Sequence, residues 1–326
     1  WSVVFFNETA TTEIYPRSLH DALPISLDTS VSTTNDYRFN PILSLKNEHR
    51  KGFTNNLQLN GFVEYELLKG LKLKVSGGYT YDARNGEQMN NSNTRYGGPT
   101  SNDKVNATSS RSQRLTWLNE NLLTYQTTIK KHHNLNTMLG FTMQNSDYES
   151  YSFKTTQIPN ESMGMAGMSE GIPSTTSSLK SSWSMMSYLA SARYNYKSKY
   201  YLTASFRADG SSKFNKKNRY GYFPSGSVAW NFSREEFAKG ISFLSNGKLR
   251  ASWGLTGNNR VGEYDTYALL EMLKSTAAYA FDGNTNSVGM VMTSLANANL
   301  KWESTEQWNI GIDMGFFRDR VSINFD

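Results

Sequence analysis

The sequence contains no cysteine, only seven prolines, few charged residues and no long apolar run. The absence of cysteine excludes disulfide bonds, thiolate metal sites and a cysteine nucleophile. No stretch approaches the roughly 18–20 consecutive apolar residues that a membrane-spanning helix needs, which excludes a helical membrane protein. Hydrophobic residues make up 37% and charged residues 19% of the 326 residues. Both fractions lie below the roughly 45–50% and 25% of typical soluble domains.

Aromatic residues and small polar residues are abundant in the chain. The chain contains 7 Trp, 19 Tyr and 17 Phe, and Asn, Ser and Thr are abundant. Disordered chains are poor in aromatic and β-branched residues, so this composition argues against disorder. Transmembrane β-barrels have this profile, because half of each strand faces a polar lumen.

The first 26 residues differ from the remainder of the chain. Residues 1–26 have neither the charged start, the apolar core nor the small-residue cleavage site of a signal peptide. They resemble the translated sequencing-adapter read-through that is fused to many metagenomic reading frames. We therefore expect residues 1–26 to be a non-native segment and residues 27–326 to form the folded unit. A natural N-terminal arm is the alternative, and resequencing of the source locus distinguishes the two.

Strict alternation of apolar and polar residues recurs along the chain, and it is the signature of a strand with two different faces. In residues 200–209, apolar residues at the even positions alternate with more polar residues at the odd positions. The pattern predicts about ten strands, near residues 54–67, 71–82, 112–127, 134–150, 185–197, 200–209, 221–233, 247–257, 301–316 and 319–326. Several exceed ten residues, whereas strands of globular proteins are usually about 5–6 residues long and a tilted membrane strand needs about 9–11.

Long and short connections alternate between these strands. The three longest lie near residues 83–111, 151–184 and 258–300. In an up-and-down sheet every second connection lies at the same end, so these three loops and the connection 210–220 gather at one end. Outer-membrane barrels have short periplasmic turns and longer extracellular loops. The sequence therefore predicts an all-β, antiparallel, up-and-down transmembrane β-barrel.

Three runs of sequence are long and specific in combination: RADGSSKFNKKNRYGYFPSGSVAWNFSREEF (Arg207–Phe237), KLRASWGLTGNNRVGEY (Lys248–Tyr264) and NANLKWESTEQWNIGIDMGFFRDRVSINFD (Asn297–Asp326). Together they resemble the SusC/RagA-like TonB-linked outer-membrane transporters. The resemblance implies a 22-stranded barrel with an N-terminal plug, a segment that engages TonB, and a SusD-like lipoprotein over the barrel. It also implies the outer membrane of a Gram-negative cell as the location and active uptake of oligosaccharides or peptides as the function.

About ten strands are fewer than such a barrel requires. The chain shows no plug domain and ends inside a predicted strand at Asp326. An unclosed sheet edge in lipid leaves backbone groups without hydrogen bonds. We therefore expect a partial barrel that does not transport by itself. Its expected partners are the SusD-like lipoprotein, TonB through the N-terminal part of the family, outer-membrane lipid and the cargo.

No motif of an enzyme or a cofactor site occurs in the sequence, which has no GxGxxG, P-loop, GxSxG or HExxH pattern. His132 and His133 lie in a short turn, and a metal site would need further ligands at suitable spacing. Glu235 and Glu236 suggest a carboxylate pair, but adjacent residues of a strand point to opposite faces. Ser233 with Glu236 fits a helix capping box instead. We predict no enzymatic activity, no cofactor and no metal site. The basic residues are spread along the chain without a clustered face, so we also predict no nucleic-acid partner.

Two groups of residues are candidates for contact with cargo. Aromatic side chains in the long loops combine a large contact area with a polar tip. By position alone these are Tyr96, Trp183, Phe214, Tyr264 and Tyr267. Packing within the loops or contact with the lid is the alternative for each. Basic residues that alternate onto the expected lumen face attract anionic cargo or pair with carboxylates of a plug. They are Lys72, Lys74, Arg193, Arg207 and Arg250.

Other functions stay open on the sequence. A passive or structural outer-membrane barrel, such as a porin or an adhesin, needs no plug. A TonB-dependent siderophore or vitamin receptor shares the barrel, and a soluble β-sandwich shares the alternation of residues. Protease treatment of intact cells separates the sandwich from a barrel, because cuts in a barrel are confined to the long loops.

Overall fold

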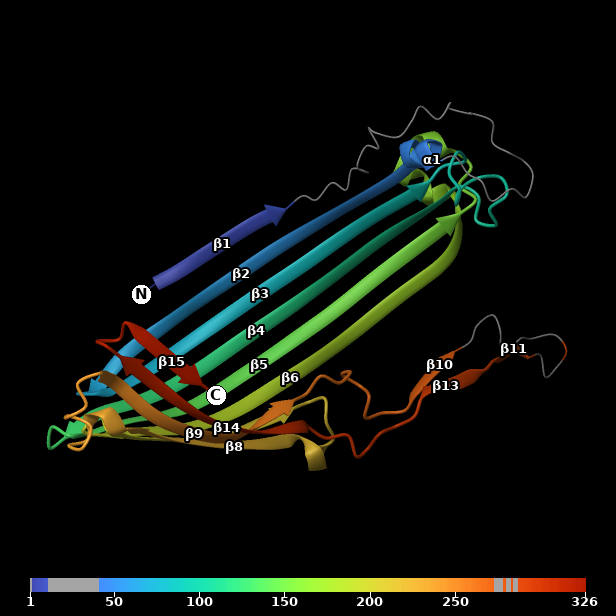
Figure 1. Ribbon diagram of the computed structural model, residues 1–326. Helices are drawn as coiled ribbons and strands as arrows, with labels where there is room; N and C mark the ends of the chain where they lie inside the picture. The colour runs from blue at the N-terminus through green and yellow to red at the C-terminus, as the bar shows by residue number, and fades with distance from the viewer. Residues whose placement is uncertain (1, 11–40, 273–277, 280–282, 284–286) are drawn as a thin grey trace.

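The computed structural model describes residues 2–10, 41–272, 278–279, 283 and 287–326. An antiparallel sheet of 11 strands dominates the structure, in the order β1-β2-β3-β4-β5-β6-β7-β8-β9-β14-β15 (Figure 1). Neighbours in the sheet follow one another along the chain, except that residues 259–302 leave the sheet between β9 and β14. The predicted all-β, up-and-down architecture is confirmed. Within the described residues the two edge strands, β1 and β15, do not pair with each other, so the barrel is not closed.

Long strands form one half of the sheet and shorter strands the other half. The long strands are β2 (Glu48–Leu68), β3 (Leu71–Asn90), β4 (Asn106–Ile129), β5 (His133–Thr156) and β6 (Ile172–Tyr196). The shorter ones are β7 (Tyr200–Ser211), β8 (Tyr220–Asn231), β9 (Leu244–Asn258), β14 (Glu303–Phe316) and β15 (Val321–Phe325). These are the ten strands that the alternation predicts.

The remaining elements are small. Strand β1 (Ser2–Ala10) pairs antiparallel with β2, and it lies within the segment that we expect to be non-native, an expectation that stays a prediction. A short helix, α1 (Pro41–Asn47), precedes β2. Among the described residues no helix is long and apolar enough to cross a membrane. The excursion 259–302 contains two pairs of antiparallel strands, β10 (Leu269–Met272) with β13 (Met290–Ser294) and β11 (Ala278–Tyr279) with β12 (Ser287–Val288).

The strand register gives the sheet two faces of opposite character. One row of directly paired residues across five strands is Tyr194, Leu202, Val228, Ala251 and Ile310. The neighbouring row is Arg193, Thr203, Ser227, Ser252 and Asn309. Because successive side chains of a strand point to opposite faces, the first row belongs to an apolar face and the second to a polar face. Leu202, Val228 and Ile310 are 50%, 54% and 73% exposed, which fits contact with lipid rather than water.

The connections differ between the two ends of the sheet. One end, which we call the short-turn end, carries residues 69–70, 130–132, 197–199, 232–243 and 317–320. The other, the long-loop end, carries residues 91–105, 157–171, 212–219 and 259–302. The predicted gathering of the long loops at one end is confirmed.

The first two long loops are shorter than the alternation indicates. The first comprises residues 91–105 instead of 83–111, and the second comprises residues 157–171 instead of 151–184. Most of the extra strand residues are Asn, Ser, Thr, Gly or charged, so apolar alternation is weak there. The hydrogen-bond ladder continues through them because it joins backbone groups and needs no apolar side chain.

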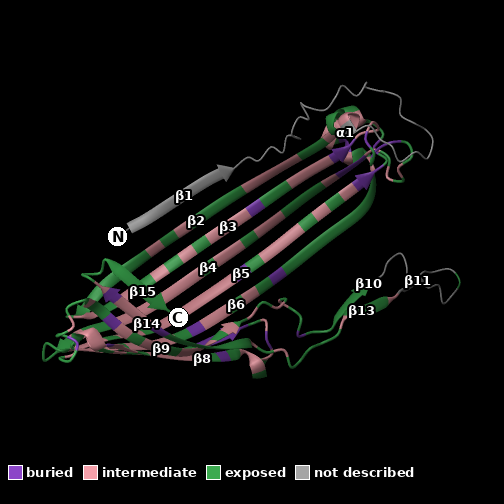
Figure 2. Ribbon diagram, in the orientation of Figure 1, coloured by how far each residue is buried: buried purple, intermediate pink, exposed green. Residues whose placement is uncertain are grey.

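A small apolar core fills the long-loop end, where Figure 2 shows buried residues gathered. Met89 and Ile158 are almost completely buried, and Met165 and Met168 of the segment Glu161–Glu170 pack against them. Glu161 joins this segment to the loop 91–105. Its carboxylate accepts hydrogen bonds from the backbone N–H of Ser92 at 2.7 Å and from the hydroxyl of Ser92 at 2.9 Å. The two loops therefore form one packed unit above β3 to β6.

Three of the short turns place residues other than glycine in the left-handed backbone region. The φ angles are 49° and 62° at Lys130 and Lys131, and 50° and 53° at Lys197 and Ser198. Arg318 adopts 59° in the turn between β14 and β15. Tight hairpins need such angles, and Asn or Gly usually supplies them. Each residue with a Cβ adopts them at a cost of about 1–2 kcal/mol.

We predict that Glu161→Ala loosens the unit formed by the two long loops without disturbing the sheet. Hydrogen bonds to a charged group contribute about 1.5–3 kcal/mol, so opening of the loops should become roughly tenfold more frequent. Limited proteolysis of the folded chain measures this as faster cleavage within residues 91–105 and 157–171. Glu170→Ala is the matched control, since Glu170 is exposed and forms no ion pair or side-chain hydrogen bond within the described residues. Equal cleavage of the two variants would contradict the prediction.

Candidate functional site

Three of the five candidate aromatic residues meet at the long-loop end. The backbone N–H of Ser182 donates to the hydroxyl oxygen of Tyr264 at 3.2 Å, which ties the excursion 259–302 to β6 beside Trp183. The Nζ atom of Lys213 lies 5.8 Å from the ring centroid of Trp183 and donates to the carbonyl oxygen of Val261 at 2.9 Å. Trp183 itself lies in β6, because that strand runs further than the sequence pattern indicates.

Phe214 follows Lys213 in the loop 212–219 and packs against Trp302. Its side chain is 2% exposed, and its ring centroid lies 5.4 Å from that of Trp302. Trp302 also contacts Phe223 at 5.5 Å and donates from Nε1 to the carbonyl oxygen of Arg219 at 3.0 Å. This burial gives Phe214 a packing role between two loops. Sequence reasoning missed Trp302. Its position directly before β14, the strand that follows the longest loop, could have identified it.

Tyr96 and Tyr267 present exposed rings at the same end of the sheet. They are 54% and 58% exposed, and Tyr264 is 41% exposed. The backbone of Tyr96 is held in place, since its carbonyl oxygen accepts hydrogen bonds from Ser101 Oγ at 2.8 Å and from Asn106 Nδ2 at 2.7 Å. The loops thus offer aromatic surface on a backbone that is fixed by hydrogen bonds.

Two of the candidate arginines on the polar face pair with carboxylates of the same sheet. The Nε atom of Arg207 lies 2.7 Å from both carboxylate oxygens of Asp209. Arg250 lies 3.1 Å from Asp313 of β14 and 2.7 Å from Asp326, which follows β15. These contacts neutralise both arginines within the sheet, so neither needs a carboxylate from another domain.

Gly311 makes room for the ion pairs of Arg250. It lies directly opposite Arg250 in the register between β9 and β14. A Cβ atom at this position would lie 2.5 Å from a carboxylate oxygen of Asp326 and 2.9 Å from Cζ of Arg250. Any side chain at position 311 would therefore push the two charged groups apart.

Arg193 differs from the other candidate cations on the polar face. Lys72 pairs with Glu64 at 3.2 Å, and the Nζ atom of Lys74 lies 4.5 Å from the ring centroid of Phe62. Arg193 is exposed, and no carboxylate of the described residues pairs with it. Its guanidinium group is therefore available to an anionic partner.

Glu235 fixes the connection 232–243 at the short-turn end. Its carboxylate accepts hydrogen bonds from Lys199 Nζ at 2.7 Å, from the Tyr200 hydroxyl at 2.7 Å and from Trp230 Nε1 at 3.3 Å. The hydrogen bond from Lys199 is the main reason that the pKa of Glu235 falls from 4.5 to about 2. One ionised carboxylate thus joins two neighbouring turns and orients two aromatic rings.

The predicted capping box at Ser233 and Glu236 is wrong. Only the residues Phe232–Arg234 are helical, as a single 3-10 turn, so Ser233 lies inside the turn and not before it. Its hydroxyl donates to Asn231 Oδ1 at 2.7 Å, and Glu236 pairs with Lys239 at 2.7 Å. A capping box needs a helix that continues for three residues after its first member.

His133 is the first residue of β5, not a turn residue as predicted, and it lies beside two tyrosines. His133 Nδ1 is 2.6 Å from the hydroxyl oxygen of Tyr194, and the His133 ring centroid is 4.8 Å from that of Tyr196. Across the part of the chain that the structure describes, no three His, Asp or Glu side chains come close enough together to hold a metal ion. Contact with the tyrosines accounts for the position of His133.

We predict that Glu235→Gln weakens the dependence of stability on acid pH. The folded-state pKa of about 2 lies below the ordinary value of 4.5, so the ionised carboxylate stabilises the fold above about pH 4.5. This contribution is lost as the pH falls toward 2. Melting temperatures of the chain in detergent micelles, followed by circular dichroism across this range, should fall more steeply for the wild type than for the variant. Glu170→Gln should keep the wild-type dependence of melting temperature on pH. Parallel dependences for the wild type and Glu235→Gln would refute the stabilising role of the Glu235 carboxylate.

Comparison with known protein families and curated proteins gives consistent matches. The family model described as TonB dependent receptor-like, beta-barrel matches residues 5–326. TonB-dependent receptor P3 of Formosa agariphila is 32% identical over 274 residues, which cover 82% of this chain and 26% of that receptor. TonB-dependent receptor SusC of Bacteroides thetaiotaomicron is 37% identical over 143 residues, which cover 44% of this chain and 14% of SusC.

Solved structures share the fold. The RagAB peptide transporter superposes with a TM-score of 0.75 at 21% sequence identity, over 86% of this chain and 30% of that one. The chain spans about a quarter of the length of the TonB-dependent receptors of Formosa agariphila that it matches. Since the family model covers nearly every residue, the chain belongs to the TonB-dependent receptor-like β-barrel family.

Proposed function

We propose that the chain is part of a TonB-dependent outer-membrane transporter that takes up oligosaccharides or peptides together with a SusD-like surface lipoprotein. The main support is the family match over residues 5–326, combined with the relation to SusC. Peptide transport is stated for RagAB, with which this chain shares the fold at low identity. Oligosaccharides and peptides therefore both stay candidate cargo.

In this proposal the sheet spans the outer membrane of a Gram-negative cell. The apolar face with Leu202, Val228 and Ile310 contacts lipid, and the polar face with Arg193, Arg207 and Arg250 lines the lumen. The long-loop end faces the cell exterior and the short-turn end faces the periplasm, as in other outer-membrane barrels. Closure of the barrel requires further strands, because unpaired backbone groups at a sheet edge are costly in lipid.

The exposed aromatic residues of the long-loop end are the proposed cargo or lid contacts. Tyr96, Tyr264 and Tyr267 offer ring faces that stack on apolar surfaces of a sugar or a peptide. Trp183 borders the same region beneath Lys213. Arg193 would bind an anionic group, either of the cargo or of a plug domain. Phe214 is left out, because its ring is buried against Trp302.

Gene deletion in the source organism tests the proposed function. Removal of the gene for the whole protein should abolish growth on one of two sole carbon sources, an oligosaccharide mixture or a peptide mixture, and removal of TonB should reproduce this defect. The tagged protein should also copurify with a surface lipoprotein. If deletion of the gene causes a growth defect that removal of TonB does not reproduce, the protein would be a passive barrel. A defect that iron or a vitamin relieves would indicate a siderophore or vitamin receptor.

Single substitutions test the aromatic contacts. In the whole protein, Tyr96→Ala and Tyr267→Ala should each lower the rate of cargo uptake roughly two- to tenfold, the effect of one lost ring contact of about 0.5–1.5 kcal/mol. Tyr151→Ala is the matched control, because Tyr151 is also 54% exposed but lies on the same face of β5 as Leu139. Surface abundance is checked by cleavage of the loops on intact cells. Unchanged uptake in both loop variants would remove these tyrosines from the binding surface.

A further inference from the structure

The short-turn end carries a concentrated positive charge that the linear sequence hides. Its five connections contain nine Lys or Arg and three Asp or Glu in 24 residues, a net charge of +6. The four connections of the long-loop end contain nine Lys or Arg and seven Asp or Glu in 82 residues, a net charge of +2. The antiparallel topology brings the five short connections together, and we call this set the basic rim.

Most of the charge on the basic rim is not neutralised by a carboxylate, although Lys197 Nζ lies 5.4 Å from the ring centroid of Tyr196. Lys199 pairs with Glu235, and Lys239 pairs with Glu236. The other seven cations are exposed and pair with no carboxylate of the described residues. They are Lys69, Lys130, Lys131, Lys197, Arg234, Arg318 and Arg320.

Backbone geometry indicates that turn formation alone does not explain these cations. Lys130, Lys131, Lys197 and Arg318 have positive φ angles between 49° and 62°. Glycine or asparagine would adopt the same angles with less strain. Basic side chains are thus present at positions where the local backbone favours other residues, as is common where a side chain has a binding role.

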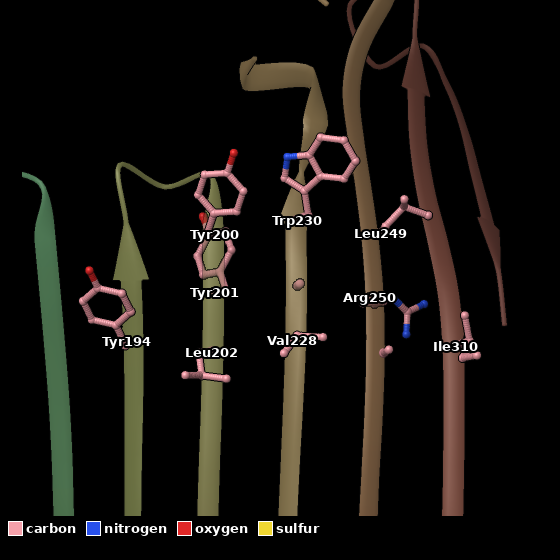
Figure 3. A pocket seen from close by; sticks show the side chains of 11 residues that line it. Tyr194, Tyr200, Tyr201, Leu202, Val228, Trp230, Leu249, Arg250 and Ile310 are labelled. Carbon is pink, nitrogen blue, oxygen red and sulfur yellow. The ribbon is translucent and has the colours of Figure 1, made fainter.

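An apolar groove of about 540 Å³ opens next to the basic rim (Figure 3). Its lining comes from β6, β7, β8, β9 and β14 and includes Tyr194, Tyr200, Trp230, Leu202, Val228 and Ile310. Ala251 lies between Val228 and Ile310 in the strand register. Its small side chain leaves space between the two larger ones. The hydroxyl of Tyr200 and Nε1 of Trp230 are turned to Glu235 at the rim, so the groove is largely apolar. Arg250 also lines it, and its guanidinium group is paired with Asp313 and Asp326.

We propose that the groove and the basic rim together bind an anionic phospholipid of the membrane leaflet at the short-turn end. One acyl chain lies in the groove along Leu202, Val228 and Ile310, and the phosphate lies near Lys197 and Arg234. Lys197 precedes Tyr200 by three residues in the turn that borders the groove, and Arg234 precedes Glu235, which holds the ring of Trp230. Lys199 is already neutralised by Glu235, whereas Lys197 and Arg234 pair with no carboxylate of the described residues, so these two cations select the negative headgroup.

The chemistry of the surface favours lipid over other occupants. The groove lies on the face whose exposed apolar residues fit contact with hydrocarbon, and aromatic residues border it where the strands end. Tyr and Trp prefer this depth of a membrane, and basic residues just beyond it attract anionic headgroups. The inference rests on the proposed membrane location and adds to it a selective lipid site.

Native mass spectrometry of the whole protein in nonionic detergent micelles tests this site. Phosphatidylglycerol and phosphatidylcholine with the same acyl chains are added in turn, and the number of retained lipids is measured. The wild type should retain phosphatidylglycerol at concentrations roughly 10- to 30-fold lower than phosphatidylcholine, as two basic contacts would give. The double variant Lys197→Gln, Arg234→Gln should lose this preference. Val228→Trp, which fills the groove, should lower retention of both lipids.

Two controls make the result specific. Lys216→Gln with Lys217→Gln removes two exposed cations of the long-loop end and should keep the preference. Leu139→Trp enlarges an exposed residue on the apolar face outside the groove and should keep retention of both lipids. The proposal would be overturned if the wild type retained the two lipids equally. It would also be overturned if Lys216→Gln with Lys217→Gln removed the preference for phosphatidylglycerol as fully as Lys197→Gln with Arg234→Gln. A chain that fractionates away from membranes refutes the proposed function, whereas a membrane-bound chain without headgroup preference refutes only this inference.

Discussion

The continuous antiparallel backbone ladder is the constraint on which the rest of this structure depends. Every strand from β2 to β9 and then β14 is paired residue by residue with its neighbours. If one strand slipped by one residue against its neighbour, its apolar side chains would move onto the polar face and its polar side chains onto the apolar face. In lipid each unpaired backbone group is costly as well, so register and membrane placement select the same arrangement.

The ladder also divides the chain into two ends with different chemistry. At the long-loop end, the buried Met89 and Ile158 and the hydrogen bonds of Glu161 hold the loops in place, so that exposed tyrosines stand on a fixed backbone. At the short-turn end four of the five connections have two to four residues, and basic charge dominates the surface. The single carboxylate of Glu235 joins two turns there and orients Tyr200 and Trp230. The same sheet thus presents a packed surface at one end and a charged rim at the other.

Sequence patterns predicted the sheet better than its ends. Alternation located all ten strands, because one apolar and one polar face leave a period of two in the sequence. It missed the outer parts of β3 to β6, where polar residues occupy both faces and only the backbone ladder continues. The capping box at Ser233 failed because the helix it requires ends after one 3-10 turn. Trp302 was missed because its role comes from contact with Phe214 and Phe223, which are distant in sequence.

The sequence by itself located ten of the eleven strands of the main sheet, the two faces, the parity of the loops and the family, since each is written in local spacing or in contiguous runs. Only the tertiary structure decided which charges are free. Arg250 is neutralised by Asp313 and Asp326, which lie more than sixty positions away along the chain, whereas Arg193 keeps no partner within the described residues. The turns of the basic rim look scattered along the sequence and become one surface when the strands pair. Electrostatic interactions depend on distance in space, and the antiparallel topology sets that distance.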